Sequence, residues 1–167
     1  LDLSTGSPLS AKLQWLSVDE QQNYLDLLLQ EKKAQTAVGK YSEVRSIYSA
    51  EQFCHDSLEG DEKRTIHLGI DIFAKAGTCI YAPFDGVVHH LNDNRGHLDY
   101  GPTVILKHQP SDGPLFYTLY GHLGSSCLKN LNIGQLIKGG MPLAETGNSK
   151  VNGGWIPHVH FQIILDL

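Results

Sequence analysis

Two residues of one strand-like run carry side chains that bind metal ions. His67 and Asp71 lie four residues apart within Ile66–Phe73, with Gly69 between them. Because side chains alternate between the two faces of a strand, these three residues share one face, and the glycine leaves room above it. The run therefore presents an imidazole and a carboxylate together. The other face is aliphatic, and we expect it to be buried: Ile66, Leu68, Ile70 and Ile72.

Two further segments supply imidazoles. His158 and His160 alternate with apolar residues and so share one strand face with Gln162. His122 follows the run Leu115–Tyr120, where Gly121 indicates a turn. Imidazole nitrogen with carboxylate oxygen suits zinc, and catalytic zinc sites use three protein ligands with one open position. Five such groups exceed that need, which leaves two imidazoles for acid, base or oxyanion chemistry. The remaining histidines are expected to be incidental: His55, His89, His90, His97 and His108.

Composition excludes several other classes of function. The 167 residues carry a formal charge of −5, and the thirteen basic residues are scattered, which argues against a nucleic-acid partner. The longest apolar runs fall far short of the ~20 residues that span a bilayer. Cys54, Cys79 and Cys127 form no CxxC pair and no even framework, so a reducing compartment fits best.

The elements that must position these groups fall into two parts. From Thr65 onward, short β-rich runs alternate with turn residues, which predicts a mainly β fold with an antiparallel sheet or small sandwich. Helical spacing over residues 18–38 predicts a helix that stops at Gly39, and a polar loop is expected over residues 57–64. We expect a helical extension or linker over residues 1–60 and a separate domain over 65–167. Since the chain starts at Leu1 and stops within an apolar strand, we expect it to be excised from a longer protein.

The motifs together closely resemble the lysostaphin-like (LytM-type) zinc metallopeptidases, which share a barrel-sandwich hybrid fold of the duplicated-hybrid-motif type. The matching segments are HLGID (67–71), APFDGV (82–87), YGHL (120–123), IKGG (137–140), TGN (146–148) and PHVHF (157–161). The resemblance implies that His67, Asp71 and His160 bind Zn²⁺ and that His122 and His158 form the catalytic pair. It further implies that zinc-activated water attacks a peptide or amide bond, with peptidoglycan peptides as the usual substrates.

One short segment differs from the family pattern, and the end of the chain indicates the kind of larger protein to which the domain would belong. Residues 152–156 read NGGWI where the family has small residues, so we expect Trp155, with Asn152 and Tyr120, to shape the substrate groove. The ending is similar to that of modules embedded in larger multidomain proteins beside a class III, pyridoxal-phosphate-dependent aminotransferase. Such a parent would be cytoplasmic, with neighbouring domains covalently linked to this one.

Two alternatives to a hydrolase remain open. The chain could be a zinc-binding regulatory or scaffolding module of an aminotransferase protein, without turnover of its own. It could also be a lipoyl or biotinyl carrier, but no lysine sits at a suitable hairpin tip and five metal-type residues would then have no use.

Overall fold

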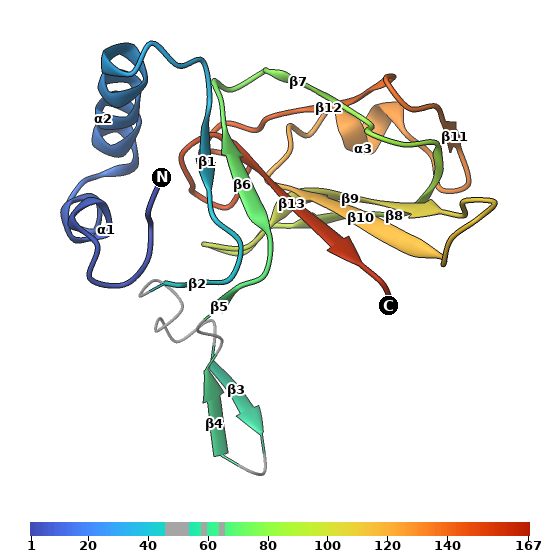
Figure 1. Cartoon of the computed structure of the whole chain (residues 1–167), viewed down its shortest axis with the longest axis horizontal. Helices are drawn as coiled ribbons and strands as arrows, with labels where there is room; N and C mark the ends of the chain where they lie inside the picture. The colour runs from blue at the N-terminus through green and yellow to red at the C-terminus, as the bar shows by residue number, and fades with distance from the viewer. Residues whose placement is uncertain (46–53, 58–59, 64–65) are drawn as a thin grey trace.

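The computed structural model describes residues 1–45, 54–57, 60–63 and 66–167. One antiparallel sheet of seven strands dominates the fold, and the pair β7–β12 covers one side of it together with the short helix α3 (Figure 1). The mainly antiparallel β fold predicted from the sequence is confirmed. In spatial order the large sheet consists of β1 (Ala37–Gly39), β6 (Ile70–Phe73), β13 (His158–Ile164), β10 (Phe116–Gly121), β9 (Gly101–His108), β8 (Gly86–Asn94) and β11 (Leu136–Ile137).

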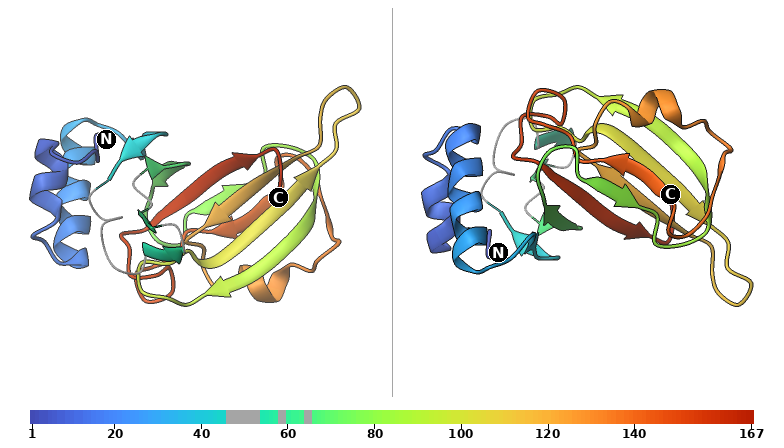
Figure 2. Two further views of the ribbon diagram at one scale, coloured as in Figure 1. Left: turned by 90° about the horizontal axis from the view of Figure 1, so that it is seen from below. Right: turned by 90° about the horizontal axis from the view of Figure 1, so that it is seen from above.

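Within the described residues, the remaining elements form three strand pairs and three helices. Helices α1 and α2 stand together at one end of the molecule, beside β1 (Figure 2). None of the helices in the described part of the chain combines the length and the apolarity needed to cross a bilayer. The pairs are β7 (Cys79–Tyr81) with β12 (Pro142–Glu145), β2 (Glu43–Val44) with β5 (Ile66–His67), and β3 (Cys54–Ser57) with β4 (Gly60–Lys63); the helices are α1 (Pro8–Leu13), α2 (Val18–Glu31) and α3 (Cys127–Asn130).

The helix predicted over residues 18–38 ends seven residues early. It begins at a capping box in which Ser17 and Glu20 bond each other's backbone. It ends in a Schellman motif, with Ala34 N–H bonded to Leu29 O and Lys33 at φ 53°. Lys33 adopts the left-handed conformation that glycine usually adopts at the end of a helix, so the predicted end at Gly39 is wrong. Residues 37–39 instead pair with β6 as an edge strand.

The long strand predicted from Ile66 to Phe73 is divided, and the first part of its aliphatic face is exposed. It forms β5 and β6, with a break at Leu68 and Gly69. Ile66 and Leu68 are 46% and 54% exposed, whereas His67 and Asp71 are buried. The predicted burial of the aliphatic face is therefore wrong at Ile66 and Leu68, whereas Ile72 packs against the main core. The polar face is buried because Arg45 and the N-terminal segment lie over it. The predicted loop at residues 57–64 contains β-strand residues at Ser57 and in β4, with 58–59 and 64 outside the described residues.

The main core lies between the large sheet and the β7–β12 pair, and it includes Tyr120. Tyr120 is 2% exposed, packs against Phe161, and lies 3.1 Å from the hydroxyl of Thr118. The prediction that Tyr120 lines the substrate groove is therefore wrong: its strand position in β10 turns the ring into the core. Burial raises the pKa of Tyr120 to about 12.

This buried phenol predicts a loss of stability at high pH. In the unfolded chain Tyr120 ionises near its ordinary value of 10, whereas in the folded chain it ionises near 12. The stabilising contribution is therefore complete below pH 10 and is lost as the pH rises from 10 to 12. We expect denaturant titrations of Tyr120→Phe to show a smaller fall in unfolding free energy across this range. An identical fall in both proteins would contradict this origin.

Candidate metal centre

Three buried side chains bring one ligand atom each to a common point. His67 Nε2, Asp71 Oδ1 and His160 Nδ1 form a triangle with sides of 3.0, 3.0 and 3.1 Å. Antiparallel pairing of β6 with β13 sets Asp71 opposite His160, and β5 carries His67. The structure therefore brings together the three residues proposed as metal ligands. Among the described residues, these three form the cluster of His, Cys, Asp or Glu side chains that could hold a metal ion.

The donor chemistry of this triangle fits a metal ion. His67 Nδ1 lies 3.0 Å from the carbonyl oxygen of Lys40, which only accepts, so Nδ1 carries the proton. Nε2 and the Asp71 carboxylate oxygen then face each other, and their contact needs a positive charge between them, which either a proton on Nε2 or a metal ion supplies. Ligand atoms about 2.0–2.1 Å from tetrahedral zinc would be roughly 3.3 Å apart, close to the observed sides. The residues present fit zinc.

Gly69 makes room for the third ligand. A Cβ at this position would lie 2.4 Å from His160 Cε1 and 2.8 Å from the backbone oxygen of Phe161. No side chain could occupy that space without displacing the imidazole or the strand. The glycine between His67 and Asp71 is thus a requirement of the site.

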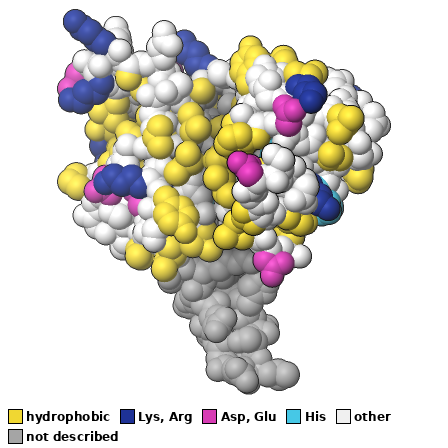
Figure 3. Space-filling view, turned by 45° about the vertical axis from the view of Figure 1, so that its right-hand side comes forward, with side chains coloured by type: hydrophobic (Ala, Val, Ile, Leu, Met, Phe, Trp, Pro, Cys, Tyr) yellow, Lys and Arg dark blue, Asp and Glu magenta, His cyan; other side chains and the backbone are white. Residues whose placement is uncertain are grey.

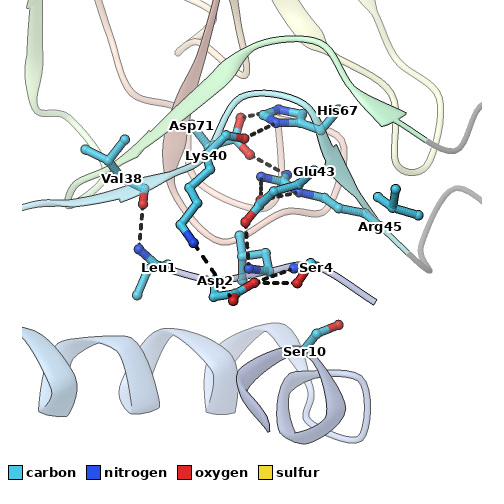
Figure 4. A network of polar contacts seen from close by, with 12 residues as sticks. Leu1, Asp2, Ser4, Ser10, Val38, Lys40, Glu43, Arg45, His67 and Asp71 are labelled. Carbon is cyan, nitrogen blue, oxygen red and sulfur yellow. Dashed lines mark hydrogen bonds and ion pairs between the residues drawn. The ribbon is translucent and has the colours of Figure 1, made fainter. Parts of the chain in front are cut away.

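Arg45 binds the other oxygen of Asp71. Its Nη1 lies 2.5 Å from Asp71 Oδ2, while Nε and Nη2 donate to Glu43, whose other oxygen accepts from Leu3 N–H (Figure 4). Burial, the largest influence, raises the pKa of Asp71, but hydrogen bonds from His160 and His67 and the charges of His158 and Arg45 outweigh it and hold the pKa well below its ordinary value. Asp71 is therefore a carboxylate, with Oδ1 directed at the histidines and Oδ2 at Arg45.

Loss of Arg45 should weaken metal binding. Removing the bond to Oδ2 frees the Asp71 carboxylate to rotate, and loss of such an outer partner costs about 10- to 100-fold in affinity. We expect Arg45→Gln to bind zinc at least about tenfold more weakly in competition with a chromogenic chelator. The control is Arg95→Gln, which removes a surface ion pair with Asp93. Equal affinities for Arg45→Gln and the unaltered protein would contradict this role.

Two further imidazoles face the triangle with fixed tautomers. His122 Nδ1 donates to Asn152 O at 2.9 Å, and His158 Nδ1 donates to Ile156 O at 2.7 Å. The Nε2 atom of each neutral ring therefore carries a lone pair, and the two ring centres lie 4.4 Å apart. Burial lowers the pKa of His158, and burial together with the charge of His158 lowers that of His122 well below its ordinary value. Both rings are thus neutral proton acceptors at neutral pH.

His122 stands on a strained turn. Its φ is 61°, an unfavourable conformation for a residue with a side chain. Its N–H donates to Tyr100 O, and its own carbonyl accepts from Gly147 N–H. Gly121, taken from the sequence as the turn residue, serves instead for close packing, because a Cβ there would lie 2.6 Å from Tyr100 Cδ1. The surrounding bonds hold His122 over the triangle.

The other two residues predicted to shape the groove have different positions. Trp155 lines the cavity beside the site, with its ring centre 5.7 Å from that of His122. Asn152 is fully buried and does not line the cavity, so its assignment to the groove is wrong. Its side chain bonds Gly147 O and both backbone groups of Trp155, and its carbonyl orients His122. It fixes the loop that carries Trp155.

Sequence reasoning missed three neighbours of the site. Arg45 lies outside every motif, and Tyr100 and Phe73 contact site histidines through ring faces. No spacing signal marks them, because their roles depend on tertiary contacts. Among the histidines considered incidental, His108 is buried at the end of β9, and its nitrogens contact Asp85 O and the Thr118 hydroxyl. It stabilises the sheet and lies away from the triangle.

A mainly β fold with a His–Asp–His triangle and two adjoining imidazoles defines a metallopeptidase type of site. The family model described as peptidase family M23 matches residues 65–166. The chain belongs to peptidase family M23.

Curated relatives share the same region. The chain is 34% identical over 96 residues to a Haemophilus influenzae protein named an uncharacterized metalloprotease, covering 58% of this chain and 18% of that protein. It is 32% identical over 100 residues to the peptidoglycan DD-endopeptidase ShyA of Vibrio cholerae, covering 59% and 20%. It is 35% identical over 96 residues to the Escherichia coli lipoprotein YgeR, covering 57% and 33%. The chain thus spans a third or less of these relatives.

Solved structures share the fold. The catalytic domain of lysostaphin from Staphylococcus simulans superposes with a TM-score of 0.51 at 19% identity, over 78% of this chain and 82% of that one. A zinc-containing peptidase from Vibrio cholerae gives a TM-score of 0.51 at 20% identity, over 77% and 33%. At these identities the likeness establishes the fold alone.

Proposed function

We propose that this chain is a zinc-dependent metallopeptidase domain that hydrolyses a peptide or amide bond. The observation that carries the proposal is the pair of neutral imidazoles, His122 and His158, fixed by backbone carbonyls with their free nitrogens beside a three-ligand metal site. Three ligands leave zinc a position for substrate or water, which is the arrangement of catalytic sites. We further propose residues 1–60 as an extension and 65–167 as the peptidase domain.

The roles of the residues follow from their protonation. His67, Asp71 and His160 would hold zinc, which when bound supplies a Lewis acid and lowers the pKa of water. His122 and His158 can each accept a proton at Nε2 and, once charged, donate it to a leaving amine or stabilise a developing oxyanion. The carbonyls of Asn152 and Ile156 keep both rings oriented throughout.

For the substrate we propose a peptide of peptidoglycan type. The support is membership of family M23 and the likeness to ShyA, which is named a peptidoglycan DD-endopeptidase. The bond cleaved would then lie beside glycine or D-alanine, as the resemblance to lysostaphin-like enzymes implies.

The experiment is a hydrolysis assay with zinc-loaded protein on glycyl and D-alanyl peptides. We expect His122→Ala to lower the rate by about 10²- to 10⁴-fold, the usual contribution of a proton-transfer group, without loss of zinc. Equal rates for the two proteins, at or above the rate of a metal-free control, would overturn the proposal.

A second candidate is a zinc-binding regulatory or scaffolding module. It is favoured by burial: each of the five site residues is at most 5% exposed, beneath the N-terminal segment. On the sequence resemblance, we propose a multidomain cytoplasmic aminotransferase protein as its setting. Stoichiometric zinc without turnover, together with changed activity of the parent on deletion of this domain, would support the module over the enzyme.

A further inference from the structure

The five site residues line one wall of a cavity of about 510 Å³. This volume lies within the range of about 300–1,000 Å³ that is usual for ligand pockets. Trp155 and Ile156 adjoin the site histidines on the same wall. The cavity is therefore continuous with the groups that would perform the hydrolysis.

The facing wall comes from the N-terminal extension, which lies outside the family match at 65–166. Leu9 and Leu13 of α1 and Leu25 and Leu28 of α2 all line the cavity. Leu25 also packs against Phe73 and Ile156, so this wall is anchored to the peptidase fold. Hydrophobic side chains cover much of the middle of one face of the molecule, with Lys and Arg side chains toward its sides (Figure 3).

Among its described residues, the cavity wall formed by α1 and α2 has no basic side chain that could bind an anionic group of a substrate. Among the described residues that line the cavity, only Arg45 is a lysine or an arginine. Its guanidinium donates hydrogen bonds to Glu43 and Asp71. The lining carboxylates are Asp71, which belongs to the metal centre, and Asp99, which is exposed and accepts from Tyr100 N–H. An anionic side chain placed against α1 and α2, away from the metal centre, would lose hydration and meet no Lys or Arg among the described lining residues of these helices.

We propose that α1 and α2 form the specificity wall of the active site and select a substrate with an uncharged, apolar side chain next to the scissile bond. This inference rests on the proposed function. An apolar side chain gains by leaving water for the leucine wall, whereas a carboxylate loses hydration there without a basic side chain from α1 or α2. The substrate class is thus a glycyl or D-alanyl peptide with an apolar neighbour, in place of an acidic one.

The test compares adjacent leucines of α2. Leu28 lines the cavity, whereas Leu27 is 63% exposed and does not line it, so Leu28→Glu and Leu27→Glu form a matched pair. The substrates are blocked tetrapeptides with a central Gly-Gly bond flanked on either side by leucine or by glutamate. We expect the unaltered protein to prefer leucine by roughly tenfold or more in kcat/KM. Leu28→Glu should abolish that preference, and Leu27→Glu should retain it.

Further measurements separate this inference from the proposed function. Leu13→Gln, on α1, replaces Leu28→Glu if the latter unfolds, and should reduce the preference in the same direction. Calorimetric binding of a leucine peptide with a reduced, uncleavable central bond needs no turnover. Binding that depends on Leu28 without hydrolysis would uphold the wall and overturn the enzyme. Hydrolysis without preference for leucine over glutamate would overturn the wall and uphold the enzyme.

Discussion

Replacement of His160 by alanine should abolish zinc binding. His160 Nδ1 is one of three atoms in the ligand triangle, and its loss leaves His67 and Asp71 alone. Because loss of an outer partner costs about 10- to 100-fold in affinity, loss of a ligand should cost more than about a hundredfold. Metal analysis after dialysis would then find less than stoichiometric zinc. His67→Ala should behave in the same way.

The control for this prediction is a histidine outside the site. His89 is exposed on β8, where its ring lies against Tyr117, and His89→Ala should keep full zinc content. Zinc binding should also raise the melting temperature of the unaltered protein, since a ligand that binds only the folded state stabilises it. His160→Ala should show no such rise. Stoichiometric zinc in His160→Ala would contradict the ligand assignment.

Strand alternation explains why much of this site could be predicted. A period of two fixes which side chains of a strand share a face, so His158 and His160 of β13 could be paired from the sequence. The same rule paired His67 with Asp71, although the break in the run places them on β5 and β6. The structure adds the register, in which Asp71 faces His160 across β6 and β13. The mainly β fold followed from the same periodicity and from turn residues. Local rules therefore reached the candidate groups, and the resemblance to lysostaphin-like enzymes singled out His67, Asp71 and His160 as the ligands.

The environment of the site depends on contacts that local rules do not describe. Glu43 lies in the two-residue strand β2, and Arg45 lies directly after it. Only the tertiary fold brings both residues next to Asp71. The same limit explains why Ile66 and Leu68 are exposed although their face was expected to be buried. Alternation shows that the two faces differ, but tertiary contacts decide how far each of them is buried.

The predicted groove shows the difference between a position in the sequence and the direction of a side chain. Tyr120 is two residues from His122, yet the ring lies in the core on the other side of the sheet. Asn152 is three residues from Trp155, yet it acts within the loop by satisfying backbone groups. The side chains opposite the site come from α2, where helical periodicity indicated only an extension or linker, and from α1, for which no helix was predicted.

His158→Ala should separate metal binding from hydrolysis. Its Nε2 lies 3.7 Å from Asp71 Oδ1, farther than either nitrogen of the triangle, and its Nδ1 donates to Ile156 O. Removal of the ring therefore takes away a proton acceptor but no proposed ligand. We expect stoichiometric zinc together with a loss of hydrolysis of about 10²- to 10⁴-fold.

The two readouts of His158→Ala are independent, which makes the variant informative. Zinc content is measured by metal analysis, and hydrolysis on the peptides that the unaltered protein cleaves. Loss of zinc would make His158 a ligand and would displace one member of the triangle. Full zinc with an unchanged rate would leave His122 as the proton-transfer group, because it alone would then present a free imidazole nitrogen, fixed by Asn152 O, beside the metal.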